Sequence, residues 1–215
     1  MSLASDTVSR AVATAVRVGS FNYMTASALH SLFRNGKVLT RRDENGSDAE
    51  REGVDLEARW MPVHDARHFE ATMPCTLTQN GFELQARPLV TPDLDFFSHH
   101  QVVGTYYPQC AEIVREATGA RVVAAFDHNV RSAAGKESKQ RIKGGQQVQG
   151  PAHLVHGDYT LTSAPQRLRD LAQPPGVNDT LRTLLSEGDS LLDPAEIEQI
   201  LSGGRFAIIN VWRNI

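Results

Sequence analysis

The sequence is poor in cysteine, in long apolar runs and in charge of one sign. Its 215 residues include two cysteines, Cys75 and Cys110, which lie outside any Cys-x-x-Cys pattern. Such spacing indicates neither a structural zinc site nor a disulfide framework, so a reducing, cytoplasmic setting is expected. No apolar run approaches the roughly 18 residues of a membrane span, and no basic stretch with an apolar core begins the chain. We therefore expect no association with a membrane.

The charge balance gives no support to nucleic acid as a partner. A net charge of -3 and a pI near 6.2 give no electrostatic basis for binding nucleic acid. The partner expected instead is a small-molecule substrate. The sequence leaves open whether the chain forms a homodimer. A chain of this length suits a single domain over residues 1–215, in which residues 1–50 form an N-terminal extension.

Helix ends and apolar periodicity predict three helices. One opens at Tyr107-Pro108 and ends at Gly119, with apolar residues at i, i+3, i+4 and i+7. The others cover residues 163–171 and a stretch that begins after Asp193 and ends at Gly203-Gly204. Extended runs predict strands, and Gln79-Asn80-Gly81 predicts a hairpin turn. These predicted strands cover residues 56–63, 69–77, 82–84, 122–126 and 206–212.

The segment 132–150 is polar and rich in glycine, glutamine and lysine. A connection of this length without its own structure is typical of a mobile loop, and such loops often act as lids over sites. We expect it to close over a binding pocket.

His156 and Asp158 are the candidate metal ligands. Side chains two residues apart in an extended segment point to the same side of the chain, so both can bind one ion. They would supply two of the three ligands in the two-His-one-carboxylate triad of non-haem Fe(II) sites. The spacing alone is weak, because about half a His-x-Asp match is expected by chance in this chain. The alternative is a hydrogen bond between the two side chains at a strand end.

Five motifs occur in an order that resembles one family of non-haem iron oxygenase-like proteins. They are Gly81-Phe82-Glu83-Leu84, Tyr106-Tyr107-Pro108, Phe126-Asp127-His128-Asn129-Val130-Arg131, Val155-His156-Gly157-Asp158-Tyr159-Thr160 and Ala207-Ile208-Ile209-Asn210-Val211-Trp212-Arg213. The family is named for the cephamycin methoxylase accessory component and for fungal gibberellin-desaturase-like enzymes. The resemblance covers roughly residues 50–215 and implies a mostly β fold with flanking helices. That fold is a double-stranded β-helix, or jelly roll, that uses Fe(II) and 2-oxoglutarate.

The resemblance also implies roles for single residues. His156 and Asp158 would be iron ligands, and His128 and Arg131 would meet the substrate. Two aromatic residues are further candidates for substrate binding, Tyr107 and Tyr159. Each has a structural alternative, since Tyr107 also suits a helix start in the core and Tyr159 a strand end.

The chain departs from the family after its last motif. Relatives carry a second iron-binding histidine and an oxoglutarate-binding arginine further on, whereas no histidine follows His156 here. The jelly roll is therefore expected to be incomplete at its C-terminal side. His128 and His153 are the nearby candidates for a substitute ligand, although His153 is expected to face the opposite side. His99 and His100 are expected at the surface.

Three functions of different classes follow. The first is a hydroxylase or desaturase of the Fe(II)/2-oxoglutarate type that acts on a small organic metabolite, as in secondary metabolism. The alternative is a catalytically silent jelly-roll relative that acts as a binding or partner subunit. A hydrolase with His156 as base ranks last, because the sequence lacks a Gly-x-Ser-x-Gly nucleophile motif.

Overall fold

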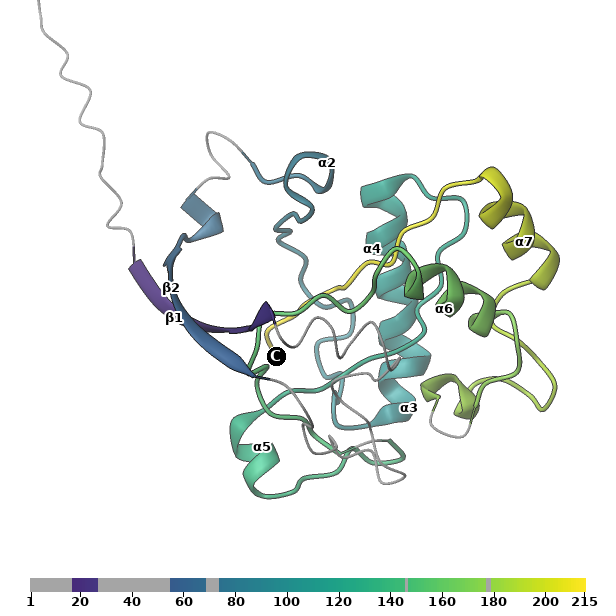
Figure 1. The fold of residues 1–215 in the computed structure, drawn as a ribbon. Coiled ribbons are helices and arrows are strands. Elements are labelled where there is room, and N and C mark those ends of the chain that lie inside the picture. The colour runs from purple at the N-terminus through teal and green to yellow at the C-terminus, as the bar shows by residue number, and fades with distance from the viewer. Residues whose placement is uncertain (1–16, 27–54, 69–73, 146, 177–178) are drawn as a thin grey trace, which may run out of the picture.

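The computed structural model describes residues 17–26, 55–68, 74–145, 147–176 and 179–215. Strands β1 (Arg17–Met24) and β2 (Leu56–Val63) pair antiparallel, with Arg17 opposite Val63 and Met24 opposite Leu56. Short helices η1 (Ala66–His68) and α2 (Leu77–Asn80) follow. Figure 1 shows the β1–β2 pair on one side of the molecule, α6 and α7 on the other, and α4 between them.

The central helical column consists of α3 (His99–Gln101), the π-helical turn η2 (Val102–Tyr106) and α4 (Tyr107–Thr118). Pro108 lies in the first turn of α4, directly after the π-helical turn η2, and its fixed φ suits a helical backbone. Gly119 ends the helix with a φ of 68°, a left-handed conformation that glycine adopts without strain. The predicted helix and its glycine cap are therefore confirmed.

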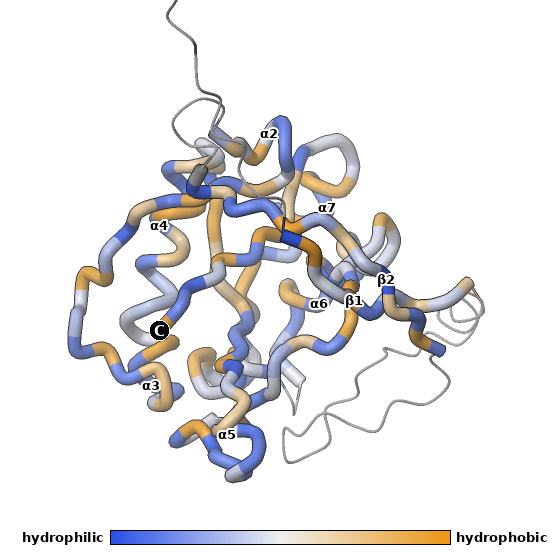
Figure 2. Tube along the Cα trace, turned by 90° about the vertical axis from the view of Figure 1, so that its left-hand side faces the viewer, coloured by the Kyte–Doolittle hydropathy of each residue, from blue (hydrophilic) through white to orange (hydrophobic). Residues whose placement is uncertain are grey.

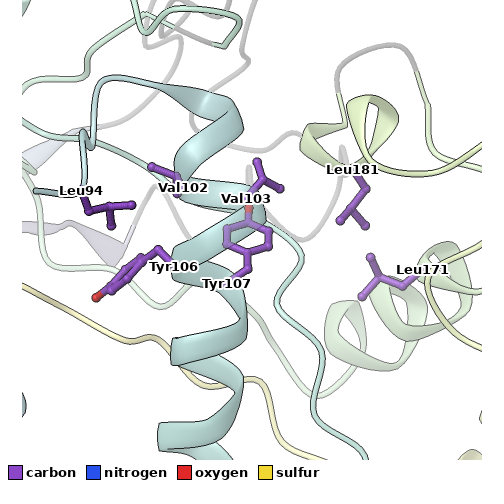
Figure 3. Close-up of a cluster of buried hydrophobic side chains, with 7 residues drawn as sticks. All are labelled: Leu94, Val102, Val103, Tyr106, Tyr107, Leu171 and Leu181. Carbon is purple, nitrogen blue, oxygen red and sulfur yellow. The ribbon is translucent and has the colours of Figure 1, made fainter. Parts of the chain in front are cut away.

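The largest apolar cluster surrounds this column. Figure 3 shows Leu171 and Leu181 facing Val103 and Tyr107 from across the cluster. Leu181 belongs to the short helix η3 (Thr180–Thr183), and Leu171 ends α6 (Ser163–Leu171). The free energy gained by burying these apolar side chains stabilises the packing of α6 and η3 against the column.

The two C-terminal helices pack against each other. Helix α7 (Pro194–Gly203) begins as its sequence predicts, since the Asp193 carboxylate accepts a 2.8 Å hydrogen bond from the Ala195 amide. Leu168 and Ala172 from α6 and its end pack against Ile197 of α7. The predictions of both helices are confirmed.

The segment 132–150 has structure of its own. It contains α5 (Ala133–Glu137), whose first turn is capped by the Ser132 hydroxyl, and a cluster in which Val148 is fully buried. The expectation of a connection without structure is wrong in this respect, because Ile142 and Val148 of the segment pack together with Val130. Its closure over a pocket stays a prediction.

Only one of the five predicted strands is found as a strand among the described residues. Residues 56–63 form β2 as expected, and residues 69–73 lie outside the described residues. Leu77 begins α2, and Gly81 ends that helix with a φ of 75° instead of forming a hairpin turn. Residues 82–84, 122–126 and 206–212 lie outside every described helix and strand. An apolar run favours a strand but does not supply the neighbour whose backbone must pair with it.

Within the described ranges, β1 and β2 form the one regular sheet. Two strands neither constitute nor exclude a jelly roll, so that fold stays a prediction. Figure 2 shows hydrophobic and hydrophilic positions interspersed along β1 and β2. Trp60 in β2 is 73% exposed. None of the described helices has the length and apolar character that crossing a membrane requires.

Candidate functional site

The stretch with the candidate metal ligands is anchored to strand β1 through one residue. The side-chain amide of Asn22 donates a 2.9 Å hydrogen bond to the carbonyl of His153. The backbone carbonyl of Asn22 accepts a 2.8 Å hydrogen bond from the Val155 amide. These two contacts fix the chain directly before His156.

The His156 ring has a defined orientation. Its Nδ1 lies 3.0 Å from the carbonyl oxygen of Leu154, and a carbonyl only accepts, so Nδ1 carries the proton. In the neutral ring Nε2 then keeps its lone pair. A hydrogen bond from the remote ring nitrogen to a carbonyl is the usual support of a metal-binding histidine.

His156 Nε2 faces Oδ1 of Asp158 across 3.4 Å. The two side chains lie on one side of the chain, as their spacing predicts. This distance is longer than the usual N–H···O hydrogen bond of about 2.9 Å. Neighbouring ligands of one ion at about 2.1 Å from each lie about 3 Å apart when they subtend a right angle. The pair is also reachable, with 38% and 48% of the two side chains exposed.

The other oxygen of Asp158 is held from a distant part of the chain. Asn210 donates a 2.7 Å hydrogen bond from its side-chain amide to Oδ2. The sequence placed Asn210 inside a recognised motif but assigned it no role. Nothing in its local pattern indicates a partner 52 residues away.

Tyr159 connects this pair to the next group of side chains. Its ring packs edge to face on Phe126 at a centroid distance of 6.5 Å, and the positive charge of Arg167 lies near its hydroxyl. The Arg167 guanidinium lies 5.2 Å from the Phe126 ring centroid. Burial raises the pKa of the Tyr159 phenol, against the opposing positive charge of Arg167. Tyr159 is thus a neutral hydrogen-bonding group near physiological pH.

A pocket of about 300 Å³ opens beside Arg167. Its lining residues are Asp127, Arg167, Gly176, Asp179 and Thr180. Asp179 and Arg167 form two parallel contacts of 3.3 Å, so their charges offset each other. Asp127 accepts a 2.6 Å hydrogen bond from the Thr180 hydroxyl. Four of its five lining residues carry a polar side chain, and the pocket lies between the segment after residue 126 and helix η3.

Tyr107 and His128, both predicted to meet substrate, bind each other. The Tyr107 hydroxyl lies 2.9 Å from Nδ1 of His128, and the His128 ring stacks on His99 at 5.4 Å. His99 Nε2 in turn lies 2.6 Å from the Thr183 hydroxyl. Tyr107 is 7% exposed, which agrees with its structural alternative as a core residue at a helix start. Contact of Tyr107 or His128 with a substrate stays a prediction.

The expectation that His99 lies at the surface is wrong. His99 is 7% exposed, whereas His100 is exposed as expected. Consecutive residues of a helical turn point about 100° apart, so one of two adjacent histidines can face the core. Burial, and secondarily the charge of His100, lowers the pKa of His99.

Arg131 supports the base of the segment 132–150. Its guanidinium donates a 2.9 Å hydrogen bond to the carbonyl of Gly150, and its backbone forms a parallel bridge with Gln149. These contacts give Arg131 a structural task. A substrate contact for this residue stays a prediction.

The donors of His156 and Asp158 suit two positions of an Fe(II) ion, since imidazole nitrogen and carboxylate oxygen are its usual ligands. Within the part of the chain that the structure describes, no three His, Cys, Asp or Glu side chains converge as a metal site. His128 and His153 both belong to that part, so neither completes the group in this conformation. The pair by itself leaves several positions of an ion open to other ligands.

Comparisons with known proteins give a family and several relatives. A family model described as Oxidoreductase/YMDC permease-like domain matches residues 21–215. A protein of Methylophilus leisingeri, named "Uncharacterized protein in dcmA 3'region", is 44% identical over 195 residues, which are 90% of this chain and 88% of that protein. "Oxidoreductase AN1597" of Emericella nidulans is 30% identical over 74% of this chain. No solved structure matches the chain significantly.

"Alpha-ketoglutarate-dependent dioxygenase tstK" of Talaromyces stipitatus is 26% identical over 89% of this chain. The fungal relatives are longer proteins. The matched region spans 45% of the Emericella protein and 60% of the Talaromyces protein.

Proposed function

This chain belongs to the family described as Oxidoreductase/YMDC permease-like domain, and from that premise we propose that it is an oxidoreductase dependent on Fe(II) and 2-oxoglutarate. It hydroxylates or desaturates a small organic metabolite. The relatives named as alpha-ketoglutarate-dependent dioxygenases support this class. The narrower family of cephamycin and gibberellin-desaturase-like proteins rests on the ordered sequence motifs.

One observation carries the proposal. His156 Nε2 and Asp158 Oδ1 face each other at 3.4 Å, while the opposite atom of each side chain is already hydrogen-bonded. These two atoms thus already lie about as close together as two neighbouring ligands of one ion. Preorganisation of this kind lowers the entropy cost of binding an ion.

In the proposed mechanism, His156 and Asp158 hold Fe(II). The bound metal, with 2-oxoglutarate, would supply the activation of O2 that removes hydrogen from an unactivated carbon. The protein residues orient the reactants and exclude water. Tyr159, packed on Phe126, would line the site beside the metal ligands and present a neutral hydroxyl to a substrate.

The pocket lined by Asp127, Arg167 and Thr180 is the proposed position for polar groups of the substrate. Because Asp179 offsets the charge of Arg167, the pocket favours hydroxyl or amide groups over a strongly anionic ligand. Tyr159 follows Asp158 in the chain and packs on Phe126, and the Phe126 ring also contacts the Arg167 guanidinium, so the pocket adjoins the proposed metal ligands.

We extend the proposal to the fold. Residues 50–215 would be part of a jelly roll in which residues 155–160 and 206–212 run beside each other. The hydrogen bond between Asn210 and Asp158 supports this neighbourhood. Structure determination of a form with the metal bound would test the pairing of these two segments.

The direct test is spectroscopic. Fe(II) and then 2-oxoglutarate are added without oxygen, and the visible charge-transfer band of a chelated iron–oxoglutarate complex is recorded. We expect the band in the native protein and in His153→Ala, and its loss in His156→Ala and Asp158→Ala. A folded native protein without the band would contradict the proposal and favour a catalytically silent binding or partner subunit.

A further inference from the structure

Asn210 and Asp158 are joined by a 2.7 Å hydrogen bond between Nδ2 and Oδ2. A carboxylate oxygen accepts and does not donate, so the NH2 side of the Asn210 amide must face it. Hydrogen bonds to a charged acceptor are stronger than those between neutral groups. This contact is therefore one of the stronger restraints on the Asp158 side chain.

The contact fixes the plane of the Asp158 carboxylate, so that one oxygen faces His156 while the other is bonded to Asn210. Oδ2 is engaged by Asn210, and Oδ1 is directed at His156 Nε2. Rotation of the carboxylate about its last bond would break the Asn210 hydrogen bond. A terminal torsion of this type is otherwise broad, so a free aspartate would sample many orientations.

The segment that contains Asn210 is anchored by Arg213, three residues further along the chain. Arg213 donates from Nε to the Tyr106 hydroxyl at 2.9 Å and from Nη1 to the carbonyl of Arg87 at 2.8 Å. Its guanidinium also lies 5.7 Å from the Tyr106 ring centroid. Tyr106 is buried in η2, so the segment with Asn210 is tied to the central helical column.

We infer that Asn210 is a positioning residue that orients Asp158 for binding a divalent metal ion. The inference rests on the proposed function, since it requires that Asp158 is a metal ligand. Its signal in the structure is a donor brought from a distant segment to the outer oxygen of a candidate ligand. Removing an outer partner of a metal ligand typically weakens metal affinity roughly 10–100-fold.

The competing explanation is that the hydrogen bond only tethers residues 206–213 to the domain. A tether affects stability without metal but leaves the bound metal's surroundings unchanged. Affinity and metal spectrum must therefore both be measured.

The experiment compares the native protein with Asn210→Leu, which keeps a similar volume without a donor, and Asn210→Ser, which is too short to reach Oδ2. Trp212→Ala is the control, because Trp212 belongs to the same segment and is 79% exposed. Anaerobic calorimetry gives the Fe(II) dissociation constant, visible spectra at saturating Co(II) report the ligand field, and thermal unfolding without metal reports stability.

We expect both Asn210 variants to bind Fe(II) roughly 10–100-fold more weakly and to change the Co(II) spectrum, while Trp212→Ala matches the native protein. Native affinity and spectrum in the Asn210 variants would overturn the inference and leave the proposed function intact. A lower unfolding midpoint with an unchanged Co(II) spectrum would show a tether and overturn it as well. A native protein that does not bind Fe(II) would overturn both proposals.

Discussion

The phenol oxygen of Tyr107 and Nδ1 of His128 lie 2.9 Å apart, and this bond links the first turn of α4 to the segment after residue 126. Edge-to-face packing of the two rings at 5.6 Å accompanies it. Both residues were selected from sequence motifs as substrate contacts. In the structure they are first of all partners of each other.

Tyr107→Phe should lower the free energy of unfolding by about 1 kcal/mol, because a buried hydrogen bond is lost and the His128 ring nitrogen loses its partner. Urea denaturation measures the change. In a double-mutant cycle with His128→Leu, the Tyr107→Phe substitution should cost less than it does in the native protein. Full additivity of the two substitutions would contradict a direct interaction.

Stability should fall as the pH is lowered from 7.5 to 5.5, through His99. Burial and the charge of His100 lower the pKa of His99 in the folded state, so the unfolded chain binds the proton more readily. The stabilising contribution is present above the unfolded pKa of about 6.5 and is lost as the pH falls through the folded pKa. Urea denaturation at several pH values measures the slope.

The variant for this test is His99→Asn, which should flatten the dependence of stability on pH. Identical slopes in the native protein and His99→Asn would assign the pH dependence to other groups.

Gly135→Ala should destabilise the protein by about 1–3 kcal/mol, because overpacking forces neighbouring atoms apart. A Cβ at Gly135 would lie 2.8 Å from Cγ1 of the fully buried Val148. Gly104→Ala is the control, since a Cβ there meets nothing within 4 Å and the position is helical. That substitution should be neutral or stabilise by up to about 1 kcal/mol. Equal midpoints of thermal unfolding for both variants would refute the close packing of residues 132–150.

Asp179→Asn should cost about 1–3 kcal/mol of folding free energy. It leaves the partly buried Arg167 guanidinium, which is 23% exposed, without its paired carboxylate. Glu112→Gln removes the exposed pair with Arg115 on α4 and should change stability by less than about 0.5 kcal/mol. If urea denaturation finds the two variants alike, the pair beneath the pocket is no stronger than a surface pair.

The helices show how far local pattern reaches. Helix α4 with its Pro108 start and Gly119 end, and helix α7 with its Asp193 cap, follow from residues within one turn of each terminus. Strands did not follow in the same way. Residues 122–126 and 206–212 have strand composition, yet a ladder depends on a neighbour that local sequence does not specify.

The candidate site also combines features that local sequence predicts with contacts that only the tertiary structure shows. The spacing of His156 and Asp158 determined that both side chains point to one side, because alternation along an extended chain is a local property. Only the tertiary structure brought in Asn22 and Asn210, which come from segments far away in the chain. It also buried His99, which sequence reasoning left at the surface. The sequence by itself determined the chemistry of the donor atoms and their local direction, whereas packing between distant segments decided which partners orient them, since such contacts depend on how the whole chain folds.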